Sequence, residues 1–215
     1  MTSIFYAMLR LIFFLVFPFI LLIRGSVFFH SNYEWMPWLS VLGGVGVTAI
    51  ILMIYMVFLQ GSFTGKIGSA NATKWKMVFA VILVLGYSIP ALFYFSDANA
   101  KSKNVQKEFT SLHPILRLST STVLFLDGKL IMTDANRVPE DYKKMGLKSK
   151  RGSLHYEQSD GYVHALDIRT NGRSEVRNFL MKSYFQLMGF NVLRHVGTDD
   201  HLHISLKSFD SPGAI

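Results

Sequence analysis

The sequence predicts a membrane-anchored α+β protein, in which three transmembrane helices precede a small domain built on an antiparallel sheet. Three observations predict this fold class. Half of the 215 residues are apolar and the mean hydropathy is +0.30, with most of the apolar excess in the first hundred positions. Residues after about Asn99 have the composition of an ordinary globular domain. Within them, short alternating segments and one helical pattern indicate strands and a helix.

Three apolar stretches are long enough to cross a bilayer, which takes about 20 residues of helix. They cover residues 4–23, 38–59 and 77–95. A cleavable signal peptide is the alternative interpretation of the first stretch, but no small-x-small cleavage pattern follows it. Pro90 interrupts the third stretch, as membrane helices tolerate. We therefore expect residues 1–97 to form a membrane domain.

Three further segments follow the predicted membrane domain. Residues 98–108 are polar and poor in large apolar side chains, which predicts a short tether. Residues 109–207 form the predicted folded domain, and residues 208–215 form a frayed tail.

Charge and cysteine content narrow the partners and the chemistry. The chain has no cysteine, so a metal site must use His, Asp or Glu. The net charge is +8, but the basic residues are scattered and flank apolar stretches, which indicates a lipid bilayer as partner and no nucleic acid. Lysines lie on both sides of the third stretch, so the positive-inside rule does not choose an orientation.

The folded domain is predicted to begin with a short helical or irregular lead-in at 112–118 and to end with a helix and two strands. After the lead-in, the expected elements in chain order are a hairpin of 122–126 with 129–133 around Asp127-Gly128, a helix from Pro139, a strand at 162–168, a helix from Ser174 to Met188, and strands at 191–196 and 201–206. Ser174 is the predicted N-cap of the long helix and Gly189 its C-cap, and Met181 and Met188 are expected in the core.

A catalytic zinc site uses three nitrogen or oxygen ligands and leaves one position open for water. His155, Asp167 and His203 supply such a set. Bound water near a zinc ion has a pKa of about 7, and a carboxylate is needed to move its proton. Asp200, three residues before His203, is the candidate for that role, with Asp199 as its rival.

Strand alternation separates the other histidines. Residues two apart on a strand point to the same face, so His201 is a rival ligand to His203. His164 lies three positions before Asp167, an odd spacing that turns His164 to the opposite face of the strand. His113 and His195 are interpreted as ordinary histidines that could line the same cleft.

These residues resemble a known family. The pattern Ser-x-His, then Gly, then Ala-x-Asp, followed by acid-x-x-His, is similar to that of the zinc DD-peptidases. This group of D-alanyl-D-alanine carboxypeptidases and endolysins shares its fold with the hedgehog signalling domain. The resemblance covers about residues 112–206 and implies that His155, Asp167 and His203 bind zinc and that Asp200 is the catalytic base.

The resemblance also implies roles for Arg137 and Ser153. Arg137, after a short predicted strand, matches the family's arginine, which holds the substrate carboxylate and helps to polarise the scissile carbonyl; a guanidinium suits both tasks. Ser153 matches a supporting serine. Twelve positions separate His155 from Asp167, more than is usual in the family, so we expect a longer loop between them.

The implied function is zinc-dependent hydrolysis of a peptide bond in peptidoglycan stem peptides. Because that substrate lies outside the cytoplasmic membrane, we expect a multi-pass inner-membrane protein with its N-terminus inside and its C-terminal domain on the periplasmic or extracellular side. The alternative is a catalytically inactive metal- or cell-wall-binding module, joined through its helices to a partner in a membrane complex. A small transporter or channel is disfavoured because the interiors of the spans lack charges.

Overall fold

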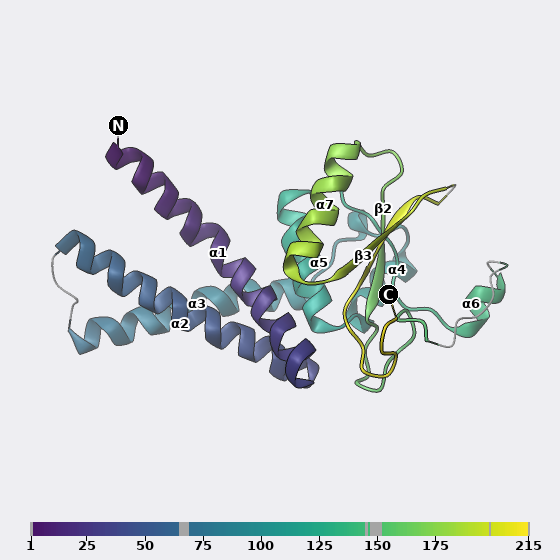
Figure 1. The fold of residues 1–215 in the computed structure, drawn as a ribbon, viewed down its shortest axis with the longest axis horizontal. Coiled ribbons are helices and arrows are strands. Elements are labelled where there is room, and N and C mark those ends of the chain that lie inside the picture. The colour runs from purple at the N-terminus through teal and green to yellow at the C-terminus, as the bar shows by residue number, and fades with distance from the viewer. Residues whose placement is uncertain (1, 65–68, 145, 147–151, 198, 215) are drawn as a thin grey trace. The chain divides into compact units, whose positions relative to one another are not determined.

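The computed structural model describes residues 2–64, 69–144, 146, 152–197 and 199–214 (Figure 1). The chain divides into two compact units, Met1–Pro90 and Ala91–Ile215, and each is described by itself. It is an α+β protein with a small four-stranded antiparallel sheet.

The first unit is helical. It contains α1 (Thr2–Tyr33), α2 (Pro37–Thr64) and most of α3 (Ala70–Phe93). A side-chain carbon at Gly44 would lie 2.5 Å from the carbonyl oxygen of Leu22, so this glycine lets α1 and α2 approach closely.

Among the residues that the structure describes, two helices are long and apolar enough to cross a membrane, by length and composition: Pro37–Phe58 and Ala70–Phe93. They correspond to the second and third predicted spans. The first predicted span, 4–23, lies within α1, where many side chains fall outside the described residues. Its role as a span stays a prediction.

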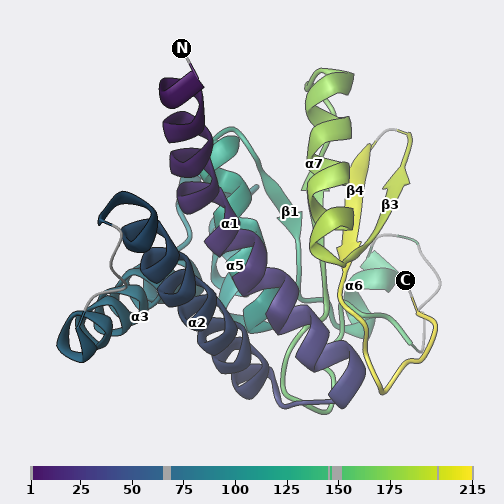
Figure 2. The ribbon, with the colours of Figure 1, turned by 60° about the vertical axis from the view of Figure 1, so that its left-hand side comes forward.

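The second unit carries the sheet and the remaining helices. In chain order these are η1 (Asp97–Asn99), α4 (Lys103–Glu108), η2 (Phe109–Ser111), α5 (Pro114–Leu126), β1 (Met132–Asp134), α6 (Pro139–Lys144), β2 (Ala165–Arg169), α7 (Glu175–Met188), β3 (Asn191–His195) and β4 (His201–Ser205). The strand order is β1-β2-β4-β3, with every pair antiparallel. Figure 2 shows α7 lying along the sheet.

The sheet has two buried faces of different chemistry. Leu166, Ile168, Leu202 and Ile204 are fully buried and alternate with the polar residues of the same strands. Arg194, paired with Leu202 across β3 and β4, reaches Glu175 of α7, so this apolar face is the one that α7 covers. Polar side chains therefore point to the other face.

The predicted hairpin is wrong. Residues 122–126 are the last turns of α5, and only Met132–Asp134 forms a strand, which pairs with β2 and not with 122–126. The β-branched Thr122 favoured the strand interpretation, but its hydroxyl donates to the carbonyl of Leu118 at 2.7 Å within the helix. Most residues of α5 are buried, and the free energy of packing this helix outweighs the weak helix propensity of its sequence.

Residues 98–108 form two short helices in place of the expected tether. The amide of Asn99 donates to the carbonyls of Gly128 at 2.9 Å and Leu130 at 2.8 Å, and Ala100 forms a bridge with Met132. A single buried amide with two donors thus attaches this segment to the strand that follows α5.

The helix from Ser174 to Met188 is confirmed. Ser174 accepts a hydrogen bond from the Arg177 N–H, and Gly189 has φ of +99°, the left-handed conformation that ends many helices. Met181 and Met188 are buried as expected, together with Asn178 and Phe185. The sequence's other apolar positions on this helix are exposed: Val176, Phe179, Leu180 and Leu187.

Candidate metal centre

Two neighbouring strands and one loop bring the predicted ligands together. Asp167 of β2 and His203 of β4 are directly opposite each other in the antiparallel register, so both side chains project from the same face of the sheet. His155 comes from the loop before β2. This loop is held by hydrogen bonds from the Arg137 N–H to the His155 carbonyl and from the His164 N–H to the Leu154 carbonyl, both at 2.9 Å.

The three ligand atoms converge on one point. His155 Nε2 lies 3.2 Å from His203 Nδ1 and 3.4 Å from Asp167 Oδ1, and His203 Nδ1 lies 2.9 Å from Asp167 Oδ1. Ligands about 2.0–2.1 Å from a tetrahedral zinc ion are separated by about 3.3–3.4 Å. All three residues are buried. They could therefore hold a metal ion with little movement.

A hydrogen bond determines which ring nitrogen of His155 faces Asp167 and His203. Its Nδ1 lies 2.7 Å from the carbonyl oxygen of Ala135, which only accepts, so Nδ1 carries the proton and the Nε2 lone pair faces the cluster. Metal-bound histidines are commonly oriented by such a bond. Nε2 of His203 is buried and has no hydrogen-bond partner among the described residues.

Asp167 is the anionic member of the group. Burial alone raises the pKa of its carboxyl, but interactions with the imidazoles of His155 and His203 outweigh burial and hold the pKa well below its usual range. Its second oxygen, Oδ2, accepts from Arg137 Nη2 at 2.6 Å. The carboxylate is thus ionised and orients one oxygen toward the two imidazoles.

The Arg137 guanidinium donates to two carboxylates. Besides Asp167 it donates from Nε to Asp134 Oδ2 at 2.9 Å, and its guanidinium carbon is 5.5 Å from the centre of the Tyr142 ring. Burial lowers the pKa of Arg137, but Asp167 and Asp134 outweigh burial and raise it above its ordinary value. In this structure Arg137 therefore orients a ligand, whereas the resemblance assigns it to the substrate.

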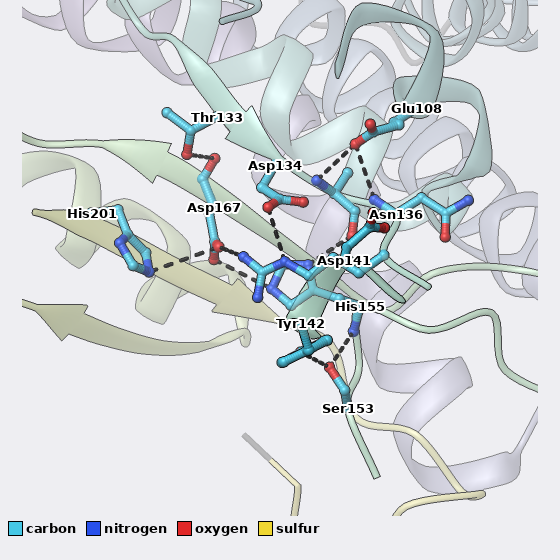
Figure 3. A network of polar contacts seen from close by, with 12 residues as sticks. Glu108, Thr133, Asp134, Asn136, Asp141, Tyr142, Ser153, His155, Asp167 and His201 are labelled. Atoms are coloured by element: carbon cyan, nitrogen blue, oxygen red, sulfur yellow. Dashed lines mark hydrogen bonds and ion pairs between the residues drawn. The ribbon is translucent and has the colours of Figure 1, made fainter. Parts of the chain in front are cut away.

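Ser153 has the supporting position that the resemblance implies. Its hydroxyl is 2.7 Å from the Tyr142 hydroxyl and accepts from the backbone N–H of His155 at 3.3 Å (Figure 3). The sequence analysis did not identify Asp134 and Tyr142. The available signal was the spacing of Asp134 three residues before Arg137.

Asp200 lines the same cleft as the three ligands, but its carboxylate is bound by other residues. Its carboxylate accepts from Arg194 Nη2 at 2.8 Å and from the Thr170 hydroxyl at 2.6 Å, and these two bonds hold its pKa below the ordinary value. Arg194 also binds Glu175 of α7, so this group lies toward the helix-covered face. The alternation that turns His164 away from Asp167 also turns Asp200 away from His203.

His201 lies on the ligand face instead. It does not replace His203 as a ligand, but its Nε2 is 3.7 Å from Asp167 Oδ2 (Figure 3). Its Nδ1 donates to the Asp199 carbonyl at 2.6 Å, and its ring stacks on His195 with centroids 4.9 Å apart. Asp199 itself is exposed.

These groups share one cleft of about 1260 Å³. Its lining includes the three ligands, His195, His201 and Asp200, and the cationic residues Lys101 and Arg169. The arrangement thus combines a buried group of residues that could hold a metal ion with two imidazole rings, His195 and His201, in the same cleft.

A second cluster of His113, Asp160 and His164 meets the same distance criterion for a metal ion. Both nitrogens of His164 face oxygens, with Nε2 2.9 Å from Asp160 Oδ2 and Nδ1 3.1 Å from the Lys207 carbonyl. The Lys207 carbonyl therefore orients His164 in the way that the Ala135 carbonyl orients His155. His113 Nδ1 accepts from the Ile115 N–H as the N-cap of α5, so its Nε2 is the nitrogen that faces Asp160. This cluster is thus a second group that could hold a metal ion.

Comparison of the chain with models of protein families, with curated proteins and with solved structures gives no match. The resemblance to the zinc DD-peptidases therefore depends on the motif residues alone.

Proposed function

We propose that this chain is a membrane-anchored, zinc-dependent hydrolase that cleaves a peptide bond in peptidoglycan stem peptides at the outer face of the cytoplasmic membrane. One observation carries the proposal: the buried ligand atoms of His155, Asp167 and His203 lie 2.9–3.4 Å from one another. The order of Arg137, Ser153 and the three ligands along the chain, as in the zinc DD-peptidases, supports the reaction class.

The donor set favours zinc over the hard cations. Two imidazole nitrogens and one carboxylate oxygen are typical ligands of catalytic zinc, whereas calcium and magnesium prefer oxygen alone. When bound at such a site, zinc lowers the pKa of its water to about 7 and polarises a carbonyl oxygen. The chain's own residues must then place the substrate and move the proton.

His201 is the proton carrier that the geometry supports best. Its Nδ1 is committed to the Asp199 carbonyl, which leaves Nε2 on the cleft side, 3.7 Å from the ligand Asp167. Imidazole can accept and return a proton near neutral pH. Asp200, the base that the resemblance implies, is held by Arg194 and is the weaker candidate in this geometry.

The cleft has room for a short peptide, since its volume is about 1260 Å³. Its lining carries Lys101 and Arg169 but also four aspartates, Asp134, Asp167, Asp199 and Asp200, so it is not uniformly cationic. Stem peptides carry free carboxylates, and Lys101 and Arg169 are the individual positions proposed to bind one of them. Since peptidoglycan lies outside the cytoplasmic membrane, the proposal includes an N-terminus inside and the sheet unit outside.

The alternative function is a binding module that keeps the metal but does not turn over substrate. The ion pairs that occupy Arg137 and Asp200 favour it, because both residues have catalytic roles in the family that the motif resembles. Metal binding without cleavage is its signature.

The test uses the full chain, purified in detergent. Metal content is measured by elemental mass spectrometry, and cleavage of purified muropeptides by liquid chromatography with mass detection. We expect bound zinc and cleavage in the parent chain, loss of both in His155→Ala and His203→Ala, and retained zinc in His195→Ala. Zinc without cleavage supports the binding module, and absence of zinc contradicts both functions.

Orientation has its own measurement. A periplasm-active reporter and a cytoplasm-active reporter are fused in turn after Ile215. Signal from the periplasmic reporter is expected, and a cytoplasmic signal removes peptidoglycan as substrate while leaving the metal site unaffected.

A further inference from the structure

The outer face of α7 is apolar although it covers no part of the sheet. Val176, Phe179, Leu180 and Leu187 are each at least 60% exposed. They recur at helical spacing and so form one stripe along the helix. The opposite side of α7, with Met181 and Phe185, already fills the core. An amphipathic helix does not need this second apolar face in order to fold.

The stripe continues onto α5. Asp127, the residue after α5, binds Arg173 and Arg177 at the start of α7, and Tyr184 of α7 donates to the Ser119 carbonyl at 2.9 Å. The two helices therefore run side by side in opposite directions. Phe125 and Leu126, 76% and 78% exposed, end α5 beside the first turns of α7.

The same helix α5 is attached to the end of a candidate membrane span. The second unit begins with the last turn of α3, and the Ser121 hydroxyl donates to the Ala91 carbonyl at 2.8 Å. Ala91 and Leu92 are buried within this unit, while Phe93 and Tyr94 are exposed. Ser121 is only two residues from Ser119, the contact with α7. Within this unit, α5 therefore contacts both the C-terminal end of α3, through Ser121, and α7, through Ser119.

Basic residues border the stripe. Arg177 and Lys182 flank it on its two sides in the helical repeat, and Lys129 is exposed near the junction of α5 with α7. Phenylalanine and leucine on one face with lysine and arginine at its edges are typical of helices that lie at the surface of an anionic bilayer.

We propose that the surface formed by Val176, Phe179, Leu180 and Leu187 of α7 with Phe125 and Leu126 of α5 docks on the lipid bilayer. The proposal rests on the membrane anchoring included in the proposed function. The sheet face covered by α7 is the one opposite Asp167 and His203, so docking turns the metal-centre cleft away from the lipid. The site then faces substrates that lie at a distance from the membrane, such as a cell-wall peptide, and not substrates embedded in it.

The absence of cysteine makes a site-specific test possible in the full chain. Single variants Phe179→Cys, Ile82→Cys and Glu140→Cys carry an environment-sensitive fluorophore in vesicles of phosphatidylcholine with phosphatidylglycerol. Ile82 is an exposed position of α3, and Glu140 is an exposed residue of α6. Quenching by lipids with a nitroxide in the acyl chain reports contact with lipid, and quenching by iodide reports contact with water.

We expect lipid nitroxides to remove roughly half or more of the fluorescence at positions 179 and 82 and little at position 140, with the reverse order for iodide. Omitting phosphatidylglycerol is expected to reduce quenching at 179 but not at 82, because Lys182, and the positive charge of Arg173 and Arg177 that their one shared carboxylate does not balance, then have no anionic headgroups. Iodide quenching at 179 equal to that at 140 overturns the docking surface. Shielding at 179 from both quenchers also overturns it, since protein then covers the stripe. Failure of lipid quenching at 82 instead contradicts the membrane anchoring.

Discussion

His155 Nδ1 lies 2.7 Å from the carbonyl oxygen of Ala135, and the backbone N–H of Arg137 returns to the carbonyl of His155 at 2.9 Å. Two segments far apart in the chain thus hold each other through reciprocal hydrogen bonds. The first bond orients one metal ligand, and the Arg137 side chain orients a second, Asp167. The residues that could hold a metal ion are therefore kept in place by the protein itself.

Arg137→Ala is expected to weaken zinc binding by about 10–100-fold, because the outer oxygen of Asp167 loses its charged donor. Competition with a chromophoric chelator measures the affinity. Arg137→Lys keeps the charge without the fork that bridges Asp134 and Asp167, so an intermediate affinity is expected. Unchanged zinc affinity with a raised KM for muropeptides would instead favour the role in substrate binding that the family resemblance implies.

Substitutions at adjacent positions distinguish the two candidate proton carriers. His201→Ala is expected to keep bound zinc and to lose at least about 100-fold in kcat, as removal of a general base commonly does. Asp200→Asn is expected to lower the melting temperature, because it weakens the pairing with Arg194, and to leave kcat within about threefold of the parent. A lost kcat in Asp200→Asn, with an unchanged melting temperature, would assign the base to Asp200.

Asp127 contributes stability that depends on pH. Burial raises the pKa of its carboxyl, but the hydrogen bond and charge of Arg173 with the charge of Arg177 outweigh burial, so the folded pKa is below the ordinary value. The fold therefore favours the ionised form. Its contribution is complete above the unfolded pKa of about 3.9 and is lost as the pH falls through the lower folded pKa.

Asp127→Asn should accordingly lower the melting temperature by a constant amount between about pH 5 and 8, and this difference should shrink below about pH 4. Thermal unfolding of the detergent-solubilised chain measures both. Glu157→Gln, which changes an exposed glutamate of the same unit, serves as the control. A difference that persists unchanged to pH 2 would contradict the ion-pair explanation.

Two phenylalanines of α7 test which face of the helix is buried. Phe185 is fully buried and Phe179 is 67% exposed. Phe185→Ala is expected to cost about 3–5 kcal/mol of unfolding free energy, because it opens a cavity in the core. Phe179→Ala in detergent is expected to stay within about 0.5 kcal/mol of the parent. Equal losses in denaturant unfolding would show that the helix packs by both faces.

Local patterns in the sequence predicted much of the fold. The apolar lengths of α2 and α3 identify two helices that could cross a membrane, since such length reflects a direct physical requirement. Alternation predicted β2 to β4, and the Ser174 and Gly189 caps predicted the bounds of α7. These signals act within a few residues, so they do not depend on the rest of the chain.

The types of residue and their order in the chain also predicted His155, Asp167 and His203 as a group, and these residues lie together in the structure. Because the chain has no cysteine, the sequence alone excluded thiolate ligands. Only the tertiary structure decided that 122–126 belong to a helix, that the apolar stripe of α7 faces outward, and that His201 and not Asp200 shares the face of His203. Each of these depends on which surface an element presents to a distant neighbour. A periodic pattern identifies the element, but the free energy of packing against segments far away in the chain selects its buried face.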